Sequence, residues 1–343
     1  MAKALDALSR RILRILSSDS RMTATSLAEK SGCSKPTALK KLRQIEKGLN
    51  LRYIPQFNYQ KLGLGHQYLV AAKTERSMGR KELLGLLGKS SIPQFAAICE
   101  GDFNLLIYAV AKSSVDYFRW AYFMRKSLQT PPGKLLSWNE SEVALPRLGF
   151  FPLRGEVLDN LDLPSTQKKL LKELNRNARV PLKSMAHILK MTPTAARYNL
   201  DMLLRKGYIH RFTAFTRAPV GGFIVALFVN KPFLPDHAER ARSVRARYFL
   251  DDDSALANRY QMSFELSGHA DLFNLIHFSS IDEWYREKGA TAELMGEGTG
   301  FSSAIILETV MGELPIRNVD VKDIYVKIEW EELGNLRRPI SLE

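Results

Sequence analysis

Two short segments of this chain start with a hydroxyl residue and a nearby proline and continue with basic or hydrogen-bonding side chains: Ser34-Lys35-Pro36 and Thr192-Pro193. A Ser or Thr hydroxyl caps a helix start well, and proline is tolerated in the first turn because its missing N–H has no partner there. Lysine suits phosphate groups, whereas arginine and asparagine can read base edges. The candidate nucleic-acid-binding residues are Ser34, Lys35, Thr37, Lys40 and Lys41 in the first segment and Thr192, Thr194, Arg197, Tyr198 and Asn199 in the second. The pattern predicts two helices whose first turns contact a polyanion.

The charge of the chain is gathered around these two segments. The 343 residues include 50 Lys and Arg against 36 Asp and Glu, a net charge of +14. Residues 1–60 alone carry a net +8 and residues 161–217 a net +9, so the rest of the chain is net negative. Basic charge in two separate blocks indicates two surfaces for a polyanion rather than a general aid to solubility.

The second basic block repeats the first at a constant shift of 158 residues, which is the spacing from Ser34 to Thr192. The same shift carries Arg21 to Arg179 and Gly63 to Gly221. It also aligns the apolar positions Leu16 with Leu174 and Leu42 with Leu200. Because the register holds without a gap, we interpret the blocks as two copies of one structural unit.

Each copy predicts three helices followed by a wing. In the first copy, helical spacing of apolar residues ends at the Ser-Asp-Ser run at 18–20, a short helix covers 23–30, and a third helix runs from the Ser34 cap to near Gly48. Segments 51–59 and 208–217 alternate apolar and polar residues, as a two-stranded wing would. Such a winged helix-turn-helix places its third helix in the major groove of double-stranded DNA. The wing residues expected to contact the DNA backbone or minor groove are Arg52, His210, Arg211 and Arg217. The alternative is a winged-helix module used for protein contacts.

The segment after each winged module predicts a βαββαβ, ferredoxin-like domain. In the first copy we expect strands at 66–74, 94–100, 103–111 and 135–145 and helices at 79–89 and 114–128. In the second copy we expect strands at 223–229, 259–266, 271–278 and 303–311 and helices near 236–247 and 280–289. The fold class is therefore α+β, with domains at 1–60, 61–148, 164–218 and 219–343 and a linker at 149–163.

This order of parts resembles the Lrp/AsnC family of transcription factors. The resemblance rests on the run LDALSRRILRILSSDSRMTATSLAEKSGCSKPTALKKLRQIEKGL and on GDFNLLIYAV, and it covers nearly the whole chain twice. It implies a cytoplasmic DNA-binding regulator whose ferredoxin-like domains pair, and several family members bind an amino acid at that interface. The residues that the resemblance suggests for such an effector are Gly101, Asp102, Asn104, His269 and Asp271. Two modules in one chain could form this pair internally, and further pairing between chains would use the same domains.

Fused tandem chains of this kind also resemble sirohaem-decarboxylase-type proteins, which place histidines and arginines around a tetrapyrrole. His269 and His277, with Arg259 nearby, are the candidates here, since residues an even number apart share one face of a strand. The alternative is that both histidines have a structural role only and form hydrogen bonds with neighbouring residues. Basic third helices would have no obvious use in such an enzyme, so we favour a regulator that is not an enzyme.

Several classes of protein are excluded by composition. No apolar run approaches 18 residues, so no membrane span is expected, and the arginines within residues 1–20 argue against a signal peptide. Cys33 and Cys99 are too few for a disulfide framework or a cysteine-rich zinc site. We expect neither a metal nor a cofactor, and a reducing cytoplasm fits best.

Overall fold

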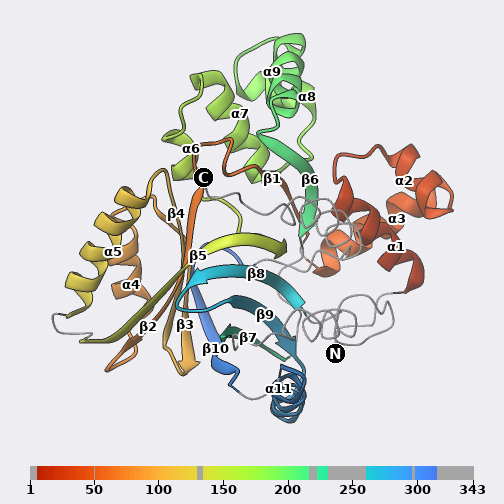
Figure 1. Ribbon diagram of the computed structural model, residues 1–343. Helices are drawn as coiled ribbons and strands as arrows, with labels where there is room; N and C mark the ends of the chain where they lie inside the picture. Colours follow the sequence, from red (N-terminus) through yellow and green to blue (C-terminus); the bar gives the residue numbers. More distant parts are fainter. Residues whose placement is uncertain are drawn as a thin grey trace, which may run out of the picture.

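The computed structural model describes residues 6–49, 51–129, 134–215, 222–230, 260–295 and 298–314. These residues fold into two helix-turn-helix heads and one closed antiparallel sheet with helices on its outside (Figure 1). No helix among them is both long and apolar enough to cross a membrane.

Head 1 comprises α1 (Ala7–Ser18), α2 (Ala24–Ser31), α3 (Lys35–Leu49) and β1 (Arg52–Phe57). Polar side chains define where its helices begin. Asp6 accepts a hydrogen bond from the Ser9 N–H at 2.8 Å, and Thr23 accepts one from the Ser26 N–H at 3.2 Å. Gly32 ends α2 with a φ of 68°, a conformation that glycine adopts without strain. The buried face of the head consists of Ile12, Leu16, Leu27, Leu42 and Ile45.

Head 2 comprises α7 (Ser165–Arg176), α8 (Leu182–Ile188), α9 (Pro193–Arg205) and β6 (Ile209–Phe215). The predicted cap is present: the Thr192 hydroxyl accepts a hydrogen bond from the Ala195 N–H at 3.1 Å, and Pro193 occupies the first turn. The core residues Leu170, Leu174, Met185, Ala186, Leu200 and Leu203 are buried. Both heads are therefore built from the capping residues and apolar spacing that their sequences contain.

The wings differ from the prediction of one two-stranded wing in each head. Strands β1 and β6 instead pair with each other in antiparallel fashion, with Tyr53 opposite Ala214 and Gln56 opposite Arg211. Helix α1 packs against β6, and α7 packs against β1, so each head holds the strand of the other copy. A lone strand exposes unpaired N–H and C=O groups, and the equivalent strand of the second copy satisfies them.

The sheet contains both ferredoxin-like domains. The first copy contributes β2 (His66–Thr74), α4 (Arg80–Leu87), β3 (Pro93–Gly101), β4 (Leu105–Ala111), α5 (Ser114–Gln129) and β5 (Leu135–Leu148). The second contributes β7 (Phe223–Asn230), β8 (Tyr260–Gly268), β9 (Leu272–Phe278), α11 (Ile281–Met295) and β10 (Gly300–Met311). The strand order is β10-β3-β4-β2-β5-β8-β9-β7, with β7 returning to β10. The last strand of each copy thus pairs with the second strand of the other, and this exchange closes the sheet. The predicted helix near 236–247 lies outside the described residues.

Strand alternation in β4 shows how the closed sheet separates two cores. Leu106 and Tyr108 belong to the interior cluster, which also contains Phe228, whereas Ile107 and Ala109 belong to the cluster covered by α4 and α5. Large aromatic side chains fill the interior, so it is a packed core. Fully buried members are Phe95, Phe103, Tyr108, Phe264 and Phe273.

Residues 149–163, which the sequence predicts to be a linker, connect the first ferredoxin-like domain to head 2 and contain α6 (Gly155–Asp159). Phe151 and Leu158 of this segment are fully buried, and the Phe151 ring lies 4.6 Å from that of Phe95. The Tyr59 hydroxyl donates a hydrogen bond to the Phe151 carbonyl. The connection is therefore packed into the interior core.

Candidate nucleic-acid interface

The first turns of α3 are open to solvent. Ser34, Lys35, Thr37 and Lys40 are exposed, and the Ser34 hydroxyl lies 2.8 Å from that of Thr37. Lys41 is half-buried and forms an ion pair with Asp6 at the start of α1. The hydrogen bond that Lys41 donates to the Asp6 carboxylate is the main reason that the pKa of Asp6 is lowered to about 2. Four of the five predicted residues of this head are therefore free to contact a ligand, and Lys41 is held by its own head.

Three further exposed residues of α3 were not among those predicted: Arg43, Gln44 and Lys47. They follow Lys40 at helical spacing and extend its polar face along the helix. Arginine and glutamine are side chains that hydrogen-bond base edges, and Lys47 suits a phosphate. The 3.6-residue period that identified the buried stripe also identifies this opposite face.

The first turns of α9 are open as well, but their chemistry is different. Thr194 and Arg197 are exposed, and Tyr198 is 59% exposed. Asn199 is half-buried, and its side-chain N–H donates to the Ala195 carbonyl at 2.9 Å, so the amide binds its own helix. Lys190, directly before the turn into α9, is a further exposed cation that was not predicted.

The four wing residues are placed in different surroundings. Arg52 forms an ion pair with Glu313 and donates to the Asn175 carbonyl at 3.2 Å. Arg211 donates from Nε to the Gln56 side-chain oxygen at 2.8 Å. Both arginines are thus engaged within the protein, because β1 and β6 lie between the two heads. Arg217 lies outside the described residues.

His210 is the exposed wing residue of β6. Partial burial lowers its pKa, and the positive charges of Arg211 and Lys61 lower the pKa further. The lowered pKa favours the neutral imidazole, which donates or accepts hydrogen bonds without carrying a charge.

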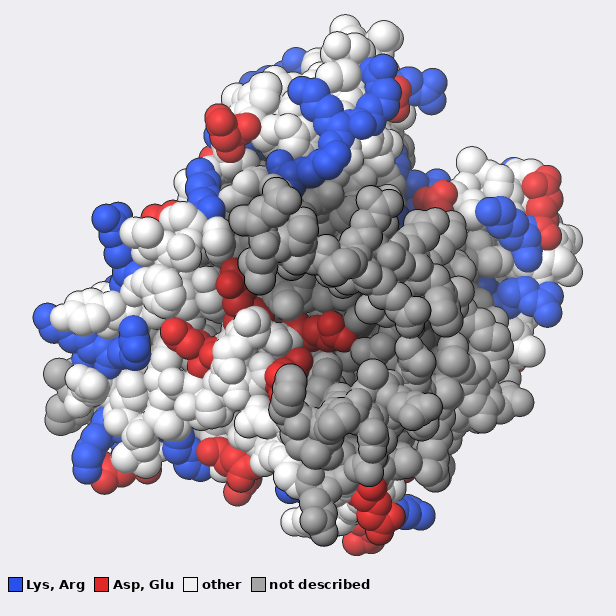
Figure 2. Space-filling model, viewed as in Figure 1, with Lys and Arg blue, Asp and Glu red and all other residues white. Residues whose placement is uncertain are grey.

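Positive charge gathers on the heads. Figure 2 shows Lys and Arg side chains over head 2 at the top of the view and on head 1 at its right. Acidic side chains also lie on both heads, and both basic and acidic side chains lie over the sheet and its helices. On head 2, the Lys and Arg side chains form one connected group in this view.

Hydrogen bonds between residues at equivalent positions of the two copies connect the two heads. Arg21 donates from Nη1 to the Ala178 carbonyl, and the Ala178 N–H donates to the Tyr53 carbonyl at 2.7 Å. In the opposite direction, the Ser20 N–H donates to the Phe212 carbonyl at 2.8 Å. Burial lowers the pKa of Arg21 from its ordinary value. These hydrogen bonds hold the two heads in a defined relative orientation.

The residues suggested for an effector occupy two structural turns. Asp102 lies in the β3–β4 turn and exchanges hydrogen bonds with Ser303 of β10 at 2.9 and 2.7 Å. In the β8–β9 turn, the His269 N–H donates to the Glu140 carbonyl of β5 at 3.2 Å. A Cβ added at Gly101 would lie 2.4 Å from the Ser303 carbonyl oxygen. These turns close the two seams of the sheet, which lie four strands apart, so the suggested residues do not meet at one site.

The other two members of that set support the same seams. The Asn104 side chain is buried and bonds the Thr74 backbone, accepting from its N–H at 2.9 Å and donating to its carbonyl at 2.8 Å. The Asp271 N–H donates to the Val229 carbonyl at 3.0 Å. Binding of an effector by any of these five residues stays a prediction.

The histidines of the tetrapyrrole hypothesis lie at opposite ends of β9. His269 precedes the strand, whereas His277 lies near its end beside Gly222. Eight residues of extended chain span roughly 26 Å, so the two imidazoles do not converge. Arg259 lies outside the described residues. Among the described residues there is also no cluster of three His, Cys, Asp or Glu side chains that could hold a metal ion.

Comparison with known proteins identifies both heads. Residues 5–46 match the AsnC-type helix-turn-helix domain, and residues 163–210 match a winged helix-turn-helix DNA-binding domain. No curated protein matches the chain. Among solved structures, siroheme decarboxylase NirDL is 13% identical with a TM-score of 0.57, covering 90% of this chain and 94% of that one. NirDL in complex with an iron-uroporphyrin III analogue is 14% identical, with the same TM-score and coverages of 91% and 95%.

Two further solved structures match about two fifths of the chain. An AsnC family transcriptional regulator from Agrobacterium tumefaciens is 20% identical with a TM-score of 0.35, covering 41% of this chain and 90% of that one. AsnC from E. coli is 18% identical with a TM-score of 0.35, covering 41% and 93%. The likeness to NirDL shows a shared fold over about nine tenths of this chain. The chain thus contains an AsnC-type and a second winged helix-turn-helix domain on an α+β scaffold.

Proposed function

We propose that this chain, with its two helix-turn-helix domains, is a sequence-specific DNA-binding transcriptional regulator of the Lrp/AsnC type, acting in the cytoplasm. The observation that carries the proposal is the exposure of the first turns of both third helices. Lys35 and Lys40 on α3 and Arg197 on α9 are exposed, and none forms an ion pair within the described part of the chain. A groove-binding helix needs this free outer face.

The two heads present unlike side chains to DNA. Helix α3 offers lysines with Arg43, a set that contacts phosphates and guanine, whereas α9 offers Thr194, Arg197 and Tyr198. Two identical half-sites would not suit both faces. An asymmetric operator with two different half-sites follows from this difference.

The spacing of the half-sites is set by the protein. Because β1 pairs with β6 and Arg21 bonds Ala178 across the heads, neither head turns freely against the other. Half-sites one or two helical turns apart, roughly 34 Å per turn, match two heads related by a pseudo-twofold axis. The covalent connection also raises the effective concentration of the second head to about millimolar once the first is bound.

Selection of bound fragments from random and genomic DNA, followed by a salt titration of the selected site, tests this function. We expect two unlike motifs at one fixed separation, and an affinity that falls steeply with salt. Fragments without a shared motif, bound no more tightly than random DNA, would contradict sequence-specific regulation. The same outcome would favour the alternative use of winged helices for protein contacts.

A tetrapyrrole enzyme is the second candidate, favoured by the full-length fold likeness to NirDL. A cavity of about 490 Å³ beneath the β1–β6 pair is lined by His210 and Arg211, together with Tyr59 and Tyr108. An imidazole and a guanidinium beside a cavity are groups that could bind a metallated, carboxylate-bearing ring. Titration of the purified protein with sirohaem separates the candidates: a visible absorbance change that is lost in His210→Ala supports the enzyme, and an unchanged spectrum removes it.

A further inference from the structure

A second cavity, of about 510 Å³, lies on the first ferredoxin-like domain, away from both third helices. Its walls are the turn before β3, the end of β4, one face of α5 and the packed helix α6. This volume is within the range of about 300–1,000 Å³ that small-molecule sites occupy. Neither the DNA-binding proposal nor the tetrapyrrole candidate uses this cavity.

The floor of the cavity is apolar. Trp120 and Val110 are buried there, and Leu64, Ile92 and Val157 complete the surface. A ligand with a hydrocarbon or aromatic portion gains free energy by removing such surface from water.

The rim of the cavity is cationic. Lys89, Lys112 and Arg119 are exposed at its edge. Lys89 lies over the Phe123 ring at 5.6 Å, and neither Lys112 nor Arg119 forms an ion pair with any residue that the structure describes. The acidic lining residue, Asp116, accepts a hydrogen bond from the Ser113 hydroxyl at 2.8 Å. The rim therefore has positive charge available for an anionic group.

We propose that this cavity binds a small organic carboxylate with an apolar tail, and that the bound molecule stiffens the joint to head 2. The tail would cover Trp120 and Val110, and the carboxylate would lie between Lys112 and Arg119. A ligand with one negatively charged end and an otherwise apolar structure fits this cavity, because its cations lie only at the edge and its floor is apolar.

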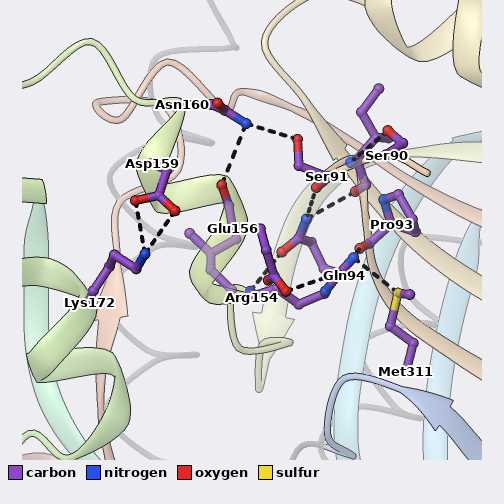
Figure 3. Close-up of polar contacts among 12 residues, drawn as sticks. Ser90, Ser91, Pro93, Gln94, Arg154, Glu156, Asp159, Asn160, Lys172 and Met311 are labelled. Carbon is purple, nitrogen blue, oxygen red and sulfur yellow. Dashed lines mark hydrogen bonds and ion pairs between the residues drawn. The ribbon is translucent and has the colours of Figure 1, made fainter. Parts of the chain in front are cut away.

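The joint is the set of contacts that connects the cavity wall to head 2 (Figure 3). The buried Gln94 side chain holds the wall turn by donating to the Ser91 and Ile92 carbonyls at 2.5 and 3.1 Å, and its oxygen accepts from the Arg154 N–H at 2.8 Å. Arg154 is the residue directly before α6, and its guanidinium donates to the Pro93 carbonyl at 2.9 Å.

Helix α6 continues these contacts into head 2. Asn160 donates to the Ser91 hydroxyl at 3.2 Å, so the end of α6 touches the same wall turn. One residue earlier, Asp159 accepts from Lys172 of α7 at 2.9 and 2.8 Å. A ligand between α5 and α6 would therefore contact a helix whose Asp159 is hydrogen-bonded to Lys172 of head 2.

Calorimetric titration with phenylacetate and with octanoate tests the site. The affinity of each carboxylate is compared with that of the corresponding uncharged amide. We expect at least one carboxylate to bind, and its amide to bind about tenfold more weakly, because the amide lacks the negative charge that Lys112 and Arg119 would contact. Lys112→Gln and Arg119→Gln should each weaken the carboxylate about tenfold, whereas Lys126→Gln, an exposed position of α5 outside the cavity, should leave it within about twofold. Equal affinities for acid and amide, no binding up to roughly 10 mM, or an unchanged affinity in both cavity variants would overturn the site.

Hydrogen exchange with and without the bound carboxylate tests the joint. Amides of α6 and α7 should exchange severalfold more slowly when the cavity is occupied, while α1 to α3 of head 1 serve as an internal control. Asp159→Asn should keep the calorimetric affinity but lose the slowing in α7. Unchanged exchange in α7 of the saturated protein would refute the stiffening. Both measurements proceed without DNA, so their result is separate from that of the DNA-binding proposal.

Discussion

The guanidinium of Arg21 in head 1 lies 5.3 Å from the ring centre of Phe212 in head 2. The equivalent residue of the second copy, Arg179, lies over Tyr53 of head 1 at 5.0 Å. Each arginine ends the turn after the first helix of its copy and covers an aromatic residue on the strand of the other. This reciprocal pair makes the two heads one unit rather than two tethered modules.

Substitution of Arg21 should weaken that unit. Arg21→Ala removes a hydrogen bond to the Ala178 carbonyl and a cation–π contact, so we expect the free energy of unfolding to fall by about 1–3 kcal/mol. Urea denaturation followed by circular dichroism measures this loss. Arg11→Ala is the matched control, because Arg11 donates to Ser31 within head 1 alone. An equal loss in both variants would contradict a special role for the contact between heads.

Lysines of α3 should contribute differently to DNA affinity according to their partners. Lys40→Ala should weaken binding to every DNA sequence and reduce the slope of log K against log salt by about one unit. Lys41→Ala should have a smaller effect, because Lys41 is paired with Asp6. Fluorescence anisotropy across a salt series measures both, with Lys81→Ala on α4 as a control. Identical slopes for the wild type and Lys40→Ala would show that Lys40 meets no phosphate.

Residues of α9 should control sequence preference. Arg197→Ala should cost about 1–3 kcal/mol on the selected operator and relax preference at one base pair, with little loss on random DNA. Asn199→Ala should change preference much less, since its amide already bonds the Ala195 carbonyl. Competition binding against single-base operator variants measures these differences. Equal losses of Arg197→Ala on specific and random DNA would assign that arginine to the backbone instead.

His210 should titrate below its ordinary pKa of about 6.5, because burial and the charges of Arg211 and Lys61 disfavour the imidazolium. An unfolded chain then binds this proton more readily than the native protein. The stability associated with His210 is therefore fully present above about pH 6.5 and is lost as the pH falls through its lowered native pKa. NMR titration of the His210 imidazole, compared with the same titration of the urea-unfolded protein, measures the shift. A pKa at or above 6.5 would contradict it.

Local sequence predicted much of the fold. The hydroxyl cap at Thr192 and the burial of Leu42 and Leu200 follow from residue type and spacing along one helix. Strand β4 is a continuous apolar run, because one of its faces contacts the interior core and the other contacts the core covered by α4 and α5. The exposed first turns of α3 and α9 were predicted for the same reason, because a helix that buries one stripe must expose the opposite one.

The partners of the strands could not be predicted in this way. A strand's N–H and C=O groups are the same whatever its sequence, so nothing local says that β1 pairs with β6 or that β10 pairs with β3. The candidate site changed accordingly: Arg52 and Arg211 are engaged between the heads, and Lys41 is held by a residue 35 positions away. The joint at Arg154 and Asp159 was likewise absent from the prediction, because proline and glycine around 152–164 indicate only an interruption of regular structure.

The amino-acid sequence alone predicted the two basic helix-turn-helix heads and the strands that follow each of them, because capping, periodicity and charge are properties of neighbouring residues. Only the tertiary structure decided how the copies exchange strands, which cations stay free, and where a cavity forms beside α6. These features depend on which distant surfaces meet, and that choice is made by packing and hydrogen bonding between the copies rather than by any local pattern.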